Sequence, residues 1–147
     1  MRLLLEHLPL SAVIGLAGWW LSGDSGCLLA ALVTGWMIDA DHLVDFLYYV
    51  ARTKGDANYA WAGTGKYFKH NGKVFVPMHA WELTIVLLSC AVVFQNASTI
   101  FVCAALAHGV HLIQDQRSYK VRPLGYWLTS RFYQDFKLDG FCATSGG

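Results

Sequence analysis

Residues 27–42 of the chain read CLLAALVTGWMIDADH. The first twelve of these residues include no Lys, Arg, Asp or Glu and show no polar face on a helical wheel, and three ionisable residues then follow within four positions. A helix that is apolar on all sides belongs in lipid or in the centre of a large protein. Because a chain of 147 residues is too short for such a centre, this stretch predicts a membrane helix that ends in a polar cluster.

Three further stretches, at residues 8–21, 83–94 and 99–107, are equally free of charge. Each is shorter than the roughly 20 residues needed to cross the hydrocarbon, so each needs an extension that contains polar residues. The chain, 55% hydrophobic overall, is therefore predicted to be an all-α polytopic membrane protein, a single domain over residues 1–147 with about four transmembrane helices. The predicted spans are residues 3–21, 27–50, 75–94 and 99–116, with a connection at 51–74 and a tail at 117–147.

The eleven basic residues are confined to the N-terminus, the connection and the tail, and the turns at residues 22–25 and 95–97 have none. The positive-inside rule makes the basic side cytoplasmic, which places both termini inside. A secretory signal peptide is the alternative for the first 22 residues. Glu6 and His7 interrupt its apolar region, and Trp19 and Trp20 resemble an interfacial anchor more than a cleavage site.

After the last predicted span, Pro123 blocks continuation of the helix. Residues 124–136 mix aromatic and basic side chains in a pattern that suits a C-terminal interfacial helix, and a solvent-exposed tail is the alternative. The four cysteines show no CxxC spacing, so they are interpreted as small buried residues and not as disulfides or zinc ligands.

Each predicted helix carries one polar cluster. The clusters are Glu6 and His7; Asp39, Asp41, His42 and Asp45; His79 and Glu82; and His108, His111 and Asp115. At about 1.5 Å per residue, all four lie roughly 20–23 Å from the turns on the uncharged side. Because the helices alternate in direction, we expect the clusters to form one layer inside the membrane, near its cytoplasmic face.

Spacing along each helix supports this layer, because residues three, four or seven apart share a helix face. Asp39 and His42 are three residues apart, and His108, His111 and Asp115 are three, four and seven residues apart. Asp41 points elsewhere than Asp39, so we assign it as a partner of a ligand, as a ligand to a second ion, or as a general base.

An ionisable group at the centre of a span costs at least about 2.5 to 3.5 kcal/mol, so the groups in this layer must neutralise one another. A divalent cation replaces the repulsion between carboxylates by coordination. Imidazole with carboxylate suits Zn²⁺, and Mn²⁺ or Fe²⁺ as alternatives, better than Mg²⁺ or Ca²⁺. The predicted metal ligands are His7, Asp39, His42, His79, His108, His111 and Asp115. Taken alone, each cluster also fits a polar helix end or a hydrogen-bonded pair. The common depth of the four clusters favours a metal site over these alternatives.

The motifs Ile38-Asp39-Ala40-Asp41-His42 and His111-Leu-Ile-Gln-Asp115, with His7 and His79, resemble the LexA-binding, inner-membrane-associated putative metal-dependent hydrolases over about residues 3–116. The resemblance implies a metal role for His7, Asp39, Asp41, His42, His79, His111 and Asp115, and a location in the inner membrane. Two departures are Ile38, where the family has proline, and Val76-Pro77-Met78, where it has a basic stretch.

These observations predict a metal-dependent hydrolase that acts at the cytoplasmic interface on a phosphoester or another ester of a lipid-like substrate. Glu82 or Asp41 would serve as general base. The alternatives are an ion or proton conductor, a protein with a purely structural metal, and haem ligation, which leaves the carboxylates unexplained. Membrane lipid is the expected partner, no nucleic acid is expected, and the oligomeric state stays open.

Overall fold

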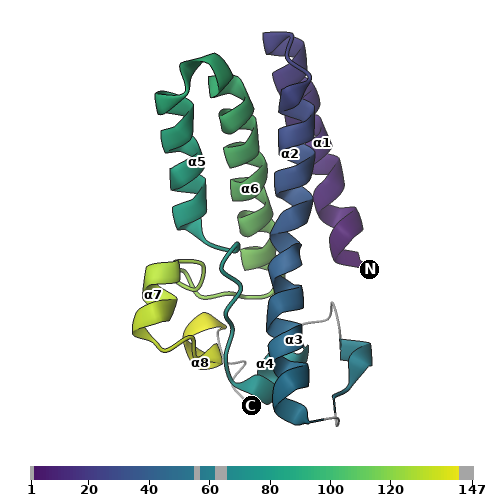
Figure 1. The fold of residues 1–147 in the computed structure, drawn as a ribbon, viewed down its shortest axis with the longest axis vertical. Helices are drawn as coiled ribbons and strands as arrows, with labels where there is room; N and C mark the ends of the chain where they lie inside the picture. Colours follow the sequence, from purple (N-terminus) through teal and green to yellow (C-terminus); the bar gives the residue numbers. More distant parts are fainter. Residues whose placement is uncertain (1, 55–56, 62–65, 143–147) are drawn as a thin grey trace.

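The computed structural model describes residues 2–54, 57–61 and 66–142, with side chains from His7 onward. Parts of the predicted connection and tail, at 55–56, 62–65 and 143–147, lie outside the described residues. Within the described part the protein is all-helical, as predicted, and contains two isolated β-bridges but no strand. Four helices lie side by side in Figure 1, namely α1 (Arg2–Ser22), α2 (Gly26–Met37), α5 (Trp81–Val93) and α6 (Ser98–Ser118).

The second long helix continues past the other three. After α2, the short 3₁₀ turn η1 (Ile38–Ala40) leads directly into α3 (Asp41–Thr53), which lies beyond the end of the four-helix bundle in Figure 1. The same end holds η2 (Tyr59–Trp61), α4 (Lys66–Asn71), α7 (Leu128–Tyr133) and α8 (Leu138–Phe141), while η3 (Gln95–Ala97) joins α5 to α6 at the other end.

Two continuous helical stretches are long and apolar enough to cross a membrane, Gly26–Thr53 and Gln95–Ser118. They correspond to the second and fourth predicted spans. Helix α5 is apolar but has only 13 residues, and it begins at Trp81 and not at Phe75 as predicted. Pro77 cannot supply a backbone N–H to a helix, and the carboxylates of Asp41 and Asp45 accept the N–H groups around it.

Close approach of the helices in the bundle depends on small residues. A Cβ atom on Gly35 of α2 would lie 1.9 Å from Oγ of Ser11 on α1, and one on Gly18 of α1 would lie 2.2 Å from Sγ of Cys103 on α6. The core between these helices is correspondingly small and apolar, formed by Cys27, Ala31, Cys103 and Ala107. Larger side chains, among them Leu29, Val33 and Val92, are exposed on the outside of the bundle.

The tail folds against the end of the bundle and does not form the single interfacial helix predicted over residues 124–136. Helix α7 ends at Tyr133, and Asp135 and Phe136 then adopt left-handed conformations with φ of 53° and 56°, which an α-helix cannot accommodate. Tyr126 and Phe141 are buried in a second core with Val74 and Val76. The tail therefore covers the segment that precedes α5.

Candidate metal centre

Five of the predicted ligands meet at the junction between the bundle and α3. His7 comes from α1, Asp39 from η1, His79 from the residues before α5, and His111 and Asp115 from α6. One ligand atom from each of Asp39, His79, His111 and Asp115 lies within 4.8 Å of all the others, and His7 Nε2 is 3.2 Å from Asp115 Oδ1. We call these five residues the metal centre, because this buried set of imidazoles and carboxylates can hold a metal ion.

The spacing of the ligand atoms is short enough for all of them to reach one metal ion. Asp39 Oδ1 is 3.5 Å from Nε2 of both His79 and His111, and Asp115 Oδ2 is 3.3 and 3.4 Å from the same two nitrogens. Ligands about 2.1 Å from an ion and separated by roughly tetrahedral angles lie about 3.4 Å apart. Four of the six separations among these atoms are therefore close to those that coordination requires, and all six are below 4.8 Å.

The atoms that face one another lack hydrogen-bond partners within the described part of the chain. They are Nε2 of His7, His79 and His111, both carboxylate oxygens of Asp39, and Oδ1 of Asp115. A buried polar atom without a partner costs about 1–3 kcal/mol, so their concentration at one point needs compensation. A cation held among them would supply it.

Each imidazole is oriented through its other nitrogen. Nδ1 of His7 donates to Oε1 of Gln114 at 3.0 Å, Nδ1 of His79 donates to Oδ1 of Asp41 at 3.1 Å, and Nδ1 of His111 donates to the carbonyl of Gly35 at 3.1 Å. With Nδ1 protonated and held in this way, the lone pair of each neutral ring is on Nε2, which faces the centre. This arrangement is the usual one for histidines that bind metals.

His42 lies at the rim of the metal centre. Its Nε2 is 3.9 Å from Asp39 Oδ1, and its Nδ1 is 3.5 Å from the hydroxyl of Tyr67. The side chains of His42 and Asp39 are 25% and 17% exposed, whereas those of His7, His79, His111 and Asp115 are 5% exposed or less. Access to the centre is therefore from the side of Asp39 and His42.

His108, predicted as a ligand, is not brought to the centre. Its Nε2 donates to the carbonyl of Met78 at 2.9 Å, and its Nδ1 accepts from the hydroxyl of Thr84 at 2.7 Å. Both ring nitrogens are occupied, so the prediction does not agree with this geometry. On the helical wheel His108 lies about 60° from His111, and in the folded chain this rotation turns it toward α5.

The two predicted general bases are also engaged elsewhere. Glu82 accepts the N–H groups of Leu128 and Thr129 and the hydroxyl of Thr129, each at 2.9 Å, so it caps the start of α7. Asp41 accepts the N–H groups of Met78 and His79 as well as the imidazole of His79. Asp41 is thus the partner of a ligand, which is one of the roles considered for it. It also forms, with His42 and His79, a second group whose ligand atoms lie within 4.8 Å of one another, so the role of ligand to a second ion stays open. Glu82 does not face the centre.

Segment 75–79, which carries His79, is held almost entirely by buried ionisable side chains. Asp45 accepts the N–H groups of Phe75 and Val76 at 2.9 Å, and Asp41 accepts those of Met78 and His79. The guanidinium of Arg131 donates to the carbonyls of Phe75, Val76 and His79 at 3.2, 2.8 and 2.8 Å. The N–H groups and carbonyls of this irregular backbone thus find hydrogen-bond partners in Asp41, Asp45 and Arg131, and His108 donates to the carbonyl of Met78.

The sequence pattern placed Arg131 among the basic residues of an interfacial helix and gave it no role beside the metal centre. Burial lowers the pKa of its guanidinium from the usual value, and the nearby carboxylates of Asp41 and Glu82 oppose that shift. An arginine stays charged in proteins, so the buried cation offsets the charge of Asp41 and Asp45. The only signal in the sequence was a single basic residue within the aromatic stretch from Tyr126 to Phe132.

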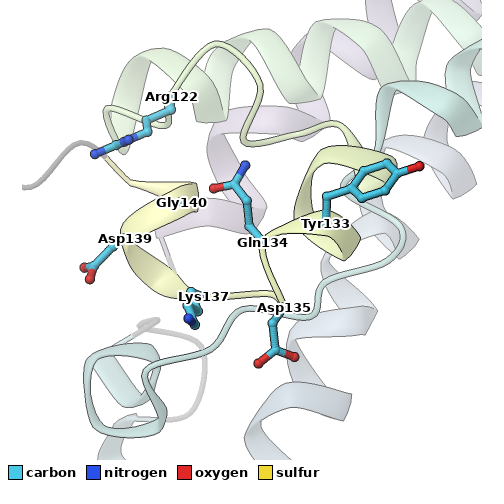
Figure 2. Close-up of a pocket in the computed structure, with 7 residues that line it drawn as sticks. All are labelled: Arg122, Tyr133, Gln134, Asp135, Lys137, Asp139 and Gly140. Carbon is cyan, nitrogen blue, oxygen red and sulfur yellow. The ribbon is translucent and has the colours of Figure 1, made fainter.

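A separate pocket in the tail is unrelated to the metal centre. Figure 2 shows its lining, which consists of Arg122, Tyr133, Gln134, Asp135, Lys137, Asp139 and Gly140 and includes none of the predicted ligands. Lys73 pairs with Asp135 at 2.9 Å and lowers the pKa of this exposed carboxyl. Charges of both signs line the pocket, so it does not select anions.

No family model, no curated protein and no solved structure matches this chain.

Proposed function

We propose that this chain is a membrane-embedded, metal-dependent hydrolase that acts near the cytoplasmic face on an ester or phosphoester of a lipid-like substrate. The observation that carries the proposal is the convergence of unpartnered ligand atoms of His7, Asp39, His79, His111 and Asp115. Three imidazoles and two carboxylates suit Zn²⁺, with Mn²⁺ and Fe²⁺ as alternatives. When bound, such a cation polarises the scissile group and supplies an activated water.

Partial exposure on one side favours catalysis over a purely structural metal. Structural zinc sites are closed by their protein ligands, whereas catalytic sites keep one position open. Here the open side is lined by Asp39 and His42. The Nδ1 of His42 lies 3.5 Å from the hydroxyl of Tyr67 and its Nε2 lies 3.9 Å from Asp39 Oδ1. In this proposal the imidazole of His42 moves a proton at the opening and takes the role predicted for Glu82.

Conduction of ions is less well supported by the interior of the bundle. Beyond the metal centre the described core between α1, α2 and α6 consists of Cys27, Ala31, Cys103 and Ala107, packed with Ile14 and Ile100. A path for ions through a membrane is lined by polar or charged groups. On the far side of the metal centre the core between the proposed spans is apolar. This arrangement fits a site that is entered from the cytoplasmic side.

Metal content and turnover test the proposal together. Detergent-purified protein should contain about one transition metal ion per chain, and His111→Ala should lose it, whereas the matched control His108→Gln should retain it. Turnover of bis(p-nitrophenyl) phosphate, or of phosphatidic acid in mixed micelles, should fall at least about 100-fold in His42→Gln while metal content is preserved. Bound metal without turnover of either probe would favour a structural centre, and metal-free protein would exclude both roles.

A further inference from the structure

The exposed face of the helix Gly26–Thr53 remains apolar well beyond the metal centre. Between residues 26 and 48, the exposed residues are all apolar: Leu29, Val33, Trp36, Met37, Ala40, Leu43, Val44, Leu47 and Tyr48. The opposite face of α3 carries Asp41, Asp45, Phe46 and Tyr49 and is buried. Helix α3 therefore has its polar groups inside and a hydrophobic face outside, which is the reverse of a helix that faces water.

Two helices of the bundle, α2 and α5, are each too short to cross a membrane by themselves. Helices α2 and α5 have 12 and 13 residues, about 18–20 Å at the α-helical rise, whereas the hydrocarbon core is about 30 Å thick. Residues 26–48 of the continuous helix extend about 33 Å. The exposed part of α3 supplies the missing length.

A tyrosine and an arginine mark the point where this apolar face ends. The guanidinium of Arg52 lies 5.7 Å from the centre of the Tyr48 ring. Asp24 lies in the turn before the helix, and no charged residue between Asp24 and Arg52 is exposed. Tyrosine is enriched at membrane interfaces, and long basic side chains reach from the helix toward the headgroups. The pair is placed as expected for a boundary between hydrocarbon and water.

Segment 75–79 gives independent support, because it lies beside α3 at the same level. Irregular backbone occurs at membrane depth only where the protein satisfies its polar groups. Asp41, Asp45, Arg131 and His108 do this for the N–H groups and carbonyls of the segment. Its exposed side chains, Phe75 and Met78, are apolar. The segment is built for surroundings without water.

We infer that the outer face of α3, formed by Leu43, Val44 and Leu47, contacts lipid acyl chains. The hydrocarbon then extends from Gly26 to about Tyr48, and Asp39 lies about 13 Å inside its cytoplasmic boundary. The inference rests on the membrane location in the proposed function and not on hydrolysis. The elements η2, α4 and α8 pack against the other side of α3 and segment 75–79 in the core that contains Val74 and Val76, and Arg131 of α7 donates to the carbonyls of the same segment.

Single cysteines test where the hydrocarbon ends. Four single-cysteine variants would be reconstituted in vesicles of phosphatidylcholine and phosphatidylglycerol: Leu43→Cys and Leu47→Cys on α3, Leu29→Cys on α2 and Lys69→Cys on α4. The vesicles would be made permeable so that the reagent reaches both faces of the membrane. A membrane-impermeant maleimide would be added, and labelling would be followed peptide by peptide by mass spectrometry, so that native cysteines do not interfere. We expect the cysteines at positions 43 and 47 to react at least about tenfold more slowly than the cysteine at position 69, because maleimide needs a hydrated thiolate. The cysteine at position 29, inside the hydrocarbon, should react equally slowly.

The outcomes separate the possible errors. Rapid labelling at 43 and 47 with protection at 29 would show that α3 is in water and would overturn the inference while leaving the membrane location intact. Rapid labelling at 29 as well would overturn both. Protection at 43 and 47 that disappears when the lipid-to-protein ratio is raised would identify a second copy of the chain as the occupant of this face, which also overturns contact with lipid.

Discussion

Each imidazole of the metal centre is fixed through Nδ1, and a different type of acceptor holds each ring. Asp41 fixes its ring most extensively, because it accepts hydrogen bonds from the imidazole of His79 and from two backbone N–H groups beside it. A carboxylate in this position fixes the ring and makes it a stronger ligand. The residue next to a metal-binding motif can therefore matter for affinity without touching the ion.

We expect Asp41→Asn to weaken metal binding about 10–100-fold, because an amide has one acceptor atom where the carboxylate has two. Glu82→Gln is the matched control, since Glu82 caps α7 and does not contact a ligand. Titration of the metal-free proteins with Zn²⁺ or with Co²⁺, whose visible spectrum reports the ligand set, measures both affinities. Equal losses in the two variants would mean that Asp41 has no special connection to His79.

Arg131→Lys should lower the free energy of unfolding by about 2–4 kcal/mol, because the ammonium of lysine cannot reach the three carbonyls that the guanidinium fork bridges and leaves some of them buried without a partner. Arg122→Lys is the control, since Arg122 is exposed in the same tail and its guanidinium donates to one carbonyl, that of Cys142. Thermal unfolding in detergent gives the comparison. A similar midpoint for both variants would contradict the role of Arg131 in holding segment 75–79.

At the scale of the elements, the close packing of α1 against α2 at Gly35 is linked to the orientation of one ligand, His111. Gly35 approaches Ser11 without room for a Cβ atom, and its carbonyl accepts from the imidazole of His111. The same residue therefore sets the distance between the helices and the orientation of a ring. A side chain at this position would move α2 relative to α1 and α6.

Gly35→Ala is expected to destabilise the protein by about 1–3 kcal/mol through overpacking and to weaken metal binding at the same time. Gly109→Ala on α6 is the control, because its nearest neighbour would be 3.6 Å from the new Cβ atom, an ordinary contact. Thermal unfolding and Zn²⁺ titration report the two effects separately. A Gly35→Ala protein that resembles Gly109→Ala in both would show that α1 and α2 can separate at no cost.

At the scale of the whole molecule, the metal centre joins segments that are distant in the sequence. His7 and Asp115 are separated by more than a hundred residues, and their side chains are 3.2 Å apart. A cation bound there would tie α1, η1, segment 75–79 and α6 together. Without it, two carboxylates and three imidazoles face one another with several atoms unpartnered.

Removal of the metal should therefore lower the stability of the whole protein. With the ion at about a thousand times its Kd, binding to the folded state alone contributes about 4 kcal/mol. A chelator should lower the melting temperature of the wild type, and added Zn²⁺ should restore it. His111→Ala provides the control, because a chelator should leave its melting temperature unchanged, and a shift there would point to a different metal site.

The sequence by itself determined the helical class, two of the apolar stretches that can cross a membrane, and the common depth of the polar clusters. These features depend on residues close together in the chain, since hydropathy and helical rise are local properties. Five of the seven predicted ligands, namely His7, Asp39, His79, His111 and Asp115, met because equal depth on neighbouring helices brings side chains together whatever the details of packing.

Only the tertiary structure decided which way each side chain points. His108 shares a helix face with His111 but is turned toward Thr84 and Met78, and Glu82 was drawn to the start of α7. The helix predicted from Phe75 begins only at Trp81, because Pro77 and the carboxylates of Asp41 and Asp45 hold the preceding backbone. Arg131 belongs to the tail that was predicted to be interfacial. Each of these choices is made by a partner far away in the sequence, because a buried polar group takes the acceptor or donor that folding places beside it.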